Sequence, residues 1–291
     1  MINQTVKIPL KGHINTNVQG HKILLRFYYA CKEYNNCKIE IDLVDLKWFD
    51  ANLCGLLLAI TEDLRETNQL DFDIPKEYWL VSYPNNFDVL HRNKFISMLL
   101  EKSIRVTEII DNQMSTIELQ KFYLTEIDEF CTYIENIFLK HRGCTIGDDA
   151  KEELSTAYTE LFANYQNHSQ TEKPIYVCGQ YFPKKNKLCF SITDVGIGFF
   201  VPIQQYTKTT GNPINDTQTA IKWALEYSNT TSINKTGGQG LHNIEKFCRT
   251  NNGDFHIISD NIYTHHNFKK NKRDFETLNT TFKGVTIHLF F

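Results

Sequence analysis

The chain has 291 residues, of which 41% are apolar and 22% are charged, and its formal net charge is −3 at pH 7. At about 150 residues per domain this length predicts two domains, each long enough to bury its own core. The 14 Tyr, 20 Phe and 3 Trp residues exclude disorder as the main state, and the small negative charge excludes a global attraction to nucleic acid or to an anionic membrane.

The N-terminus has no apolar core of the signal-peptide kind, and no apolar run approaches the ~20 residues of a membrane span. None of the eight cysteines forms a CxxC pair, so a zinc ribbon is not expected. We expect free, mostly buried thiols in a reducing compartment, and therefore a cytoplasmic protein that has neither membrane nor nucleic acid as a partner.

The first third alternates between strand and helix patterns. The clearest helical spacing lies in the expected helix 50–66, for which Asp50 is the expected N-cap. A β-α-β-α succession favours a small α/β domain in which helices pack on a sheet. The expected strands are 5–10, 38–43 and 78–82, and the expected helices are 23–34, 50–66 and 86–100.

The segment 102–114 is polar and fits either an edge strand or a linker. Beyond it we expect strands at 116–122, 175–181, 187–193, 254–259 and 285–290, and helices at 127–139 and 150–167. The basic run Lys269–Arg273 is expected to be a solvated loop. The predicted organisation is a domain over 1–104, a linker over 105–115 and a second domain over 116–291.

A first motif lies on the helix 150–167, where Glu160, Asn164 and His168 are spaced four apart. This spacing places all three on one helix face. An amide oxygen there could bind a hard cation while the carboxylate orients water. Taken alone, the motif fits the polar side of a solvated helix better than a binding site.

A second motif, Thr193–Phe199 (TDVGIGF), directly follows the strand 187–193. An Asp at a strand end followed by two alternate glycines forms a turn against which a ligand can lie. The carboxylate of Asp194 can accept a hydrogen bond from an amino group on a planar ring. A plain turn is the alternative.

A third motif, Thr236–Leu241 (TGGQGL), opens a helix whose apolar face is Leu241, Ile244 and Phe247. Unobstructed backbone N–H groups at a helix N-terminus favour a phosphate. The motif is not a P-loop, because no Lys-Ser/Thr pair follows, nor a dinucleotide fingerprint, because no strand immediately precedes it. A flexible loop is the alternative.

In this order, the three motifs resemble the GHKL (Bergerat-type) ATP-binding fold of histidine kinases, anti-sigma-factor kinases, gyrase and heat-shock chaperones. Glu160–His168 matches its N box, Asp194–Gly198 its first glycine box and Gly237–Leu241 its second. The resemblance covers 116–291, where Ala220–Asn229 and the residues after it are similar to the helix and lid of the anti-sigma-kinase-like branch. It implies an α/β sandwich, a mixed sheet covered by helices.

The resemblance also implies roles for individual residues. Asn164 would ligate a Mg²⁺ ion that bridges the phosphates of ATP, and Glu160 would be the catalytic base or would position it. Asp194 would accept the hydrogen bond of the adenine amino group, while Gly196 and Gly198 let the base lie close.

In the second glycine box, Gly237, Gly238 and Gly240 would hold the phosphates, with Leu241 closing the box. The last strand of the family often carries Gly-Thr, with the Thr near adenine. Here the residues are Gly284, Val285 and Thr286, so Thr286 is not assigned to the site.

Residues 39–60 resemble a STAS-like domain, the fold of anti-sigma-factor antagonists. There a strand leads through a short loop into a helix whose start carries a Ser that the partner kinase phosphorylates. The corresponding residues 49–53 (FDANL) contain neither Ser nor Thr, so we expect this acceptor to be absent. A generic small α/β domain is the alternative.

These features predict a cytoplasmic, bacterial-type regulatory protein that binds Mg-ATP and uses its nucleotide state to control a protein partner. Alternatives are a serine/threonine protein kinase acting on a separate STAS protein, a non-enzymatic interaction module, and a GHKL ATPase of a defence or toxin system. Whether the chain is an ATPase, a kinase or neither, and whether it forms a homodimer, is left open by the sequence.

Overall fold

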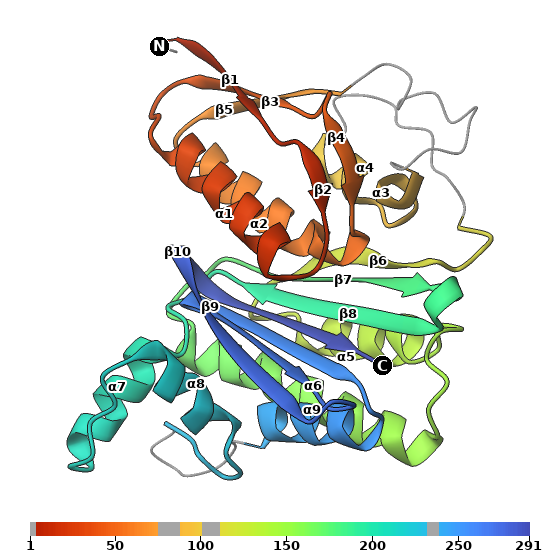
Figure 1. The fold of residues 1–291 in the computed structure, drawn as a ribbon, viewed down its shortest axis with the longest axis vertical. Helices are drawn as coiled ribbons and strands as arrows, with labels where there is room; N and C mark the ends of the chain where they lie inside the picture. The colour runs from red at the N-terminus through yellow and green to blue at the C-terminus, as the bar shows by residue number, and fades with distance from the viewer. Residues whose placement is uncertain (1–3, 75–87, 101–110, 232–238) are drawn as a thin grey trace.

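The computed structural model describes residues 4–74, 88–100, 111–231 and 239–291. These residues form a mixed α/β structure whose strands belong to three sheets. Figure 1 shows the N-terminal part stacked on the larger C-terminal sheet, with further helices beneath that sheet.

The N-terminal part is built from parallel strands joined by helical crossovers, and its main sheet has the order β1-β3-β5. The predicted strands 5–10 and 38–43 and helices 23–34 and 50–66 are confirmed with shifted ends, whereas the short strands β2, β4 and β5 were not predicted. The elements are β1 (Thr5–Pro9), β2 (Gly12–Ile14), α1 (Val18–Lys32), β3 (Lys38–Asp42), β4 (Leu46–Phe49), a 3₁₀ turn η1 (Ala51–Leu53), α2 (Cys54–Arg65) and β5 (Gln69–Asp73).

The single helix predicted over 86–100 is wrong for its described residues, which form α3 (Asp88–Arg92) and α4 (Phe95–Leu99). The break falls at Asn93 and Lys94, because Lys94 has a left-handed φ of 65° and the Asn93 side chain bonds the Phe95 N–H and the Ala51 carbonyl. The strand expected at 78–82 and most of the polar segment 102–114 lie outside the described residues.

The C-terminal sheet has the order β6-β7-β8-β10-β9. All four pairings are antiparallel, so the prediction of a mixed sheet is wrong. Short connections explain this, since β7 leads into β8, and β9 into β10, as hairpins. The five predicted strands are confirmed, two of them at greater length: β6 (Thr116–Phe122), β7 (Ile175–Phe182), β8 (Lys187–Asp194), β9 (Asp254–Asn267) and β10 (Lys272–Phe290).

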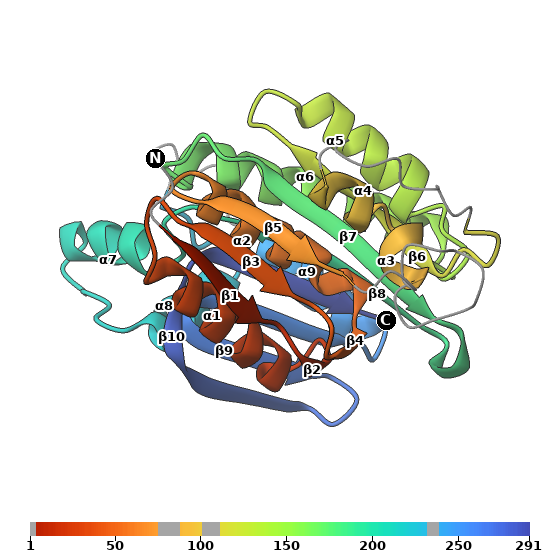
Figure 2. The same cartoon turned by 90° about the horizontal axis from the view of Figure 1, so that it is seen from above.

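Helices cover one face of this sheet, as Figures 1 and 2 show. Their shared core is rich in aromatic rings, with Phe138 stacked on Phe190 at 4.1 Å between ring centroids. The predicted helices 127–139 and 150–167 are confirmed, the first ending in a π-helical turn. The elements are α5 (Ile127–Tyr133), η3 (Ile134–Phe138), α6 (Asp148–His168), α7 (Phe200–Thr209), α8 (Thr217–Leu225) and α9 (Gly240–Thr250).

The other face of the C-terminal sheet is covered by α1 and α2. One continuous core cluster joins Leu24 and Leu56 of these helices to Tyr176, Ile258 and Phe282 of the sheet. The described chain is therefore a stack of four layers: the N-terminal sheet, α1 with α2, the five-stranded sheet, and α5 with α6 and α9.

Buried histidines join α1 to the C-terminal sheet. The Nε2 atoms of His21 and His288 lie 2.9 Å apart, and both side chains are fully buried. His21 donates through Nδ1 to the carbonyl of Asn17 (2.8 Å), so its Nε2 accepts from His288. The Nδ1 of His288 then accepts from the Ser191 hydroxyl at 2.6 Å. This chain of bonds requires both imidazoles to be neutral.

Candidate functional site

A large pocket opens between α6, the end of β8, helices α7 and α8, and the start of α9. It holds about 980 Å³ of empty space, part of it open to solvent. Its wall is mostly apolar. The lining residues are Leu161, Asn164, Tyr165, His168, Ser169, Ile175, Ile192, Asp194, Gly198, Phe199, Pro202, Ile203, Trp223, Ala224, Asn229, Thr230, Thr231, Leu241, Val285 and Ile287.

Among the described residues of this wall, Asp194 is the one carboxylate, and it stands at the end of β8. Its Oδ1 accepts the N–H of Gly196 at 2.8 Å. Burial raises the pKa of Asp194 to about 7, because the surroundings disfavour its charged form. In its ionised form this carboxyl only accepts hydrogen bonds, so that form favours a ligand that brings a hydrogen-bond donor.

Local structure explains why positions 196 and 198 are occupied by glycine. A Cβ on Gly196 would lie 2.7 Å from the Cβ and the carbonyl oxygen of Ser169, so only glycine lets this turn approach the end of α6. Gly198 has a left-handed φ of 71° and lies against Ser259. The turn is also tied to α6 by the Ile197 N–H, which donates to the Ser169 carbonyl at 3.0 Å.

The predicted residues of α6 divide between two places. Asn164 and His168 line the pocket, and burial lowers the pKa of His168 below its usual value. Glu160 is instead hydrogen-bonded to the start of α9, where its Oε1 accepts the N–H of Gln239 at 2.7 Å. A carboxylate at a helix N-terminus is favoured by the helix dipole.

The second glycine motif is described only in part, since Gly237 and Gly238 lie outside the described residues. Gly240 is the first residue of α9, and a Cβ there would lie 2.9 Å from the Ala157 carbonyl and 3.0 Å from the Glu160 Cβ. This close approach of α9 to α6 brings Leu241 into the pocket wall.

Several lining residues were not predicted from the sequence. Ile192 could have been found, because it lies two residues before Asp194 and so shares its face of β8; Val285 and Ile287 alternate in the same way on β10. Phe199 belongs to the second motif and Trp223 to the segment 220–229 that resembles the helix before the lid, but neither residue was assigned to the site.

The position that corresponds to the STAS acceptor is buried. Ala51 and Asn52 face β7, where the Ala51 N–H donates to Gln180 Oε1 at 2.8 Å. Asp50 stands at the N-cap position of η1, as predicted, but its side chain makes no cap hydrogen bond. Its carboxylate accepts instead from the Thr16 backbone and hydroxyl and from the Trp48 indole.

We compared the chain with family models and with curated proteins, and no match was found in either. Within the described residues, no three or more His, Cys, Asp or Glu side chains gather as a metal site. Nor does any helix in that part of the chain combine the length and apolar character that a membrane crossing needs.

Proposed function

We propose that this chain binds Mg-ATP in the pocket between α6, the end of β8 and α9, and that its nucleotide state controls a protein partner. The observation that carries the proposal is the Asp194 carboxyl group in a mostly apolar pocket. Adenine combines a flat apolar ring with an exocyclic amino donor, and both properties fit this wall.

The base end of the pocket has apolar walls on both sides. Ile192, Val285 and Ile287 come from the sheet, and Phe199 comes from the segment that follows the glycine turn. Guanine carries a carbonyl oxygen where adenine carries the amino group, so a carboxylate at this position favours adenine.

The other end of the pocket suits phosphate. Asn164 and Leu241 lie there, next to the start of α9, where backbone N–H groups and the helix dipole favour an anion. Mg²⁺ is often held by one or two protein oxygens together with phosphate oxygens, and Asn164 offers one. When bound, the ion would neutralise phosphate charge.

The partner is proposed to be a protein because of the fold. A whole α/β layer, the N-terminal part, is docked on the sheet that carries the nucleotide pocket. Such a layer adds surface for a partner and is in contact with the elements that form the pocket.

A melting experiment tests the proposal. ATP with Mg²⁺ at about 100 times its Kd should stabilise the fold by about 2.7 kcal/mol, a rise of several degrees in Tm. Asn164→Ala should abolish the Mg²⁺ dependence, whereas Asn167→Ala, on the exposed side of α6, should leave it intact. An unchanged Tm in millimolar Mg-ATP would refute the proposal.

Turnover is tested separately with Glu160→Gln. The amide oxygen can keep the bond to the Gln239 N–H, so we expect unchanged ATP affinity. If the unaltered chain hydrolyses ATP or transfers its phosphate, the variant should be about 10²- to 10⁴-fold slower. Normal turnover in the variant would contradict a catalytic role for Glu160.

A further inference from the structure

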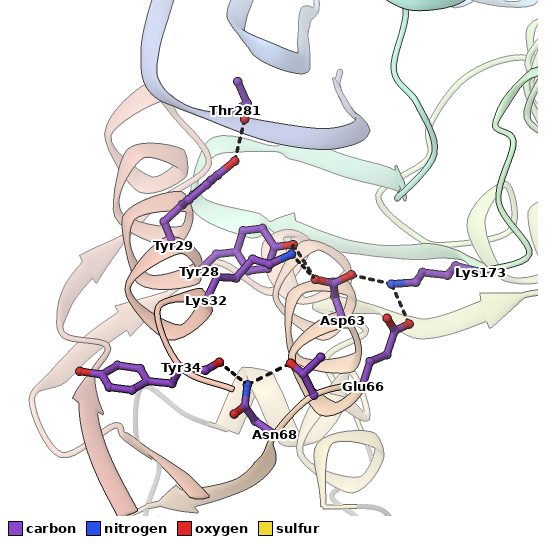
Figure 3. A network of polar contacts seen from close by, with 10 residues as sticks. Tyr28, Tyr29, Lys32, Tyr34, Asp63, Glu66, Asn68, Lys173 and Thr281 are labelled. Carbon is purple, nitrogen blue, oxygen red and sulfur yellow. Dashed lines mark hydrogen bonds and ion pairs between the residues drawn. The ribbon is translucent and has the colours of Figure 1, made fainter. Parts of the chain in front are cut away.

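The connection between α6 and β7, residues 169–174, contacts both the pocket and the N-terminal helices. At its far end Lys173 Nζ lies 2.5 Å from Asp63 Oδ1 and 2.9 Å from Glu66 Oε1, both on or next to α2 (Figure 3). The carbonyl of Lys173 accepts the hydroxyl of Tyr165, which lines the pocket. One residue therefore bonds to both regions.

Asp63 is the centre of this network. Its other oxygen accepts the Tyr28 hydroxyl at 2.6 Å and lies 3.2 Å from Lys32 Nζ, both on α1 (Figure 3). Burial alone would raise the pKa of Asp63, but the bonds from Lys173 and Tyr28 and the charges of the two lysines lower it to about 2. The group is thus an anion shared by α1, α2 and the connection.

The near end of the connection is part of the pocket wall. Ser169 lines the pocket, and its carbonyl accepts the Ile197 N–H. Gly196 packs so closely against Ser169 that a side chain at position 196 would not fit. A displacement of the connection must therefore move the glycine turn that follows Asp194.

Space for such a displacement exists beside the network. A second cavity, with about 340 Å³ of empty space including open solvent, is bordered by Asp63, Lys173, Thr171 and Val195. Val195 lies between Asp194 and Gly196. This cavity therefore borders both the Asp63–Lys173 pair and the segment between Asp194 and the glycine turn.

We propose that Lys173 makes the docked N-terminal helices a positioning element of the nucleotide pocket. Its pairing with Asp63 holds residues 169–174, and through them the base end of the pocket, in the binding geometry. A protein partner that loosens α2 would then weaken nucleotide binding, and by linkage nucleotide would tighten the contact between the layers. This inference rests on the proposed function.

The first test compares ATP affinity in three variants of the full chain. Lys173→Met should raise the Kd for Mg-ATP about tenfold, within the usual range of coupling between sites, and Lys173→Arg should restore it. The matched control is Lys22→Met, because Lys22 pairs with Glu276 at 3.2 Å across the same interface, away from the connection. Equal weakening by Lys173→Met and Lys22→Met would overturn the proposal.

The second test needs no nucleotide. Amide hydrogen exchange in residues 169–174 and 195–198 should be faster in Lys173→Met and in Asp63→Asn, and unchanged in Lys173→Arg and Lys22→Met. Unchanged exchange in both of the first two variants would overturn the positioning role. Failure of the unaltered chain to bind ATP would instead refute the proposed function, and the exchange data would still decide on positioning.

Discussion

The two faces of the five-stranded sheet are both buried, but by different means. Toward α6 and α9 the strands present Phe190, Ile192 and Ile287, and this face borders the pocket. Toward α1 and α2 the same strands present polar side chains, including Ser191 and His288, which are buried and hydrogen-bonded. The difference shows that a strand with alternating polar and apolar residues need not expose its polar face to solvent.

The pH dependence of stability tests the buried histidines of the polar face, and we expect it to be the largest effect. Burial lowers the pKa of His21 to about 4 and those of His256 and His288 well below their usual value. Because the unfolded chain binds more protons below pH 6.5, stability should fall as the pH drops toward 4, by about 3 kcal/mol from His21 alone.

Charged neighbours of these histidines are paired: Lys22 with Glu276, and Asp254 with Lys187 and His265. Asp194 contributes with the opposite sign, since a pKa raised to about 7 stabilises the fold as the pH falls below 7. Urea unfolding at pH 7.5, 6.5, 5.5 and 4.5 checks the sum. His288→Gln should flatten the dependence and Asp194→Asn should steepen it, whereas stability that does not decline toward pH 4.5 would contradict the neutral histidine pair.

Two truncations test whether the two faces of the five-stranded sheet are equally well packed. Phe190 and Tyr176 are almost completely buried, one in each core cluster. Each change to Ala should cost about 3–5 kcal/mol of unfolding free energy. A near-neutral Tyr176→Ala beside a costly Phe190→Ala, measured by denaturant unfolding, would show that the N-terminal layer is only loosely docked.

Gly196→Ala addresses the pocket with a smaller effect. The new methyl would lie 2.7 Å from Ser169 atoms, so we expect a loss of about 1–3 kcal/mol together with weaker ATP binding. Gly147→Ala is the control, because a Cβ there meets nothing within 4 Å. Equal stability and equal ATP affinity in the two variants would mean that the turn at Gly196 can shift to accommodate a methyl group at little cost.

Most elements of the C-terminal part were predicted from their patterns, whereas α7 was not. Strong period-2 runs gave its strands, and helical spacing gave α6 and α9. The residues that line the pocket on β8 and β10 follow from alternation once Asp194 is placed. By contrast, β5 (QLDFD) has two aspartates, and β2 and β4 are too short to show a period.

Docking of the N-terminal layer on the C-terminal part was expected from the pairing of the two modules that the chain resembles, but the residues that make the contact could not be predicted. Ser191, Thr193, Thr286 and His288 are polar but buried, and their burial depends on partners distant in sequence, such as His21, which is 267 residues from His288. The bond between Glu160 and Gln239 likewise depends on how closely α6 and α9 pack.

Calorimetric titration of the full chain with Mg-ATP and Mg-GTP tests the central claim most directly. If Asp194 accepts a hydrogen bond from the amino group of adenine, ATP should bind and GTP should bind more weakly by about 1–3 kcal/mol, or roughly 5- to 150-fold. Asp194→Asn should reduce that preference, since the amide presents a donor as well as an acceptor. Equal affinity for the two nucleotides, or no binding of either, would contradict the account.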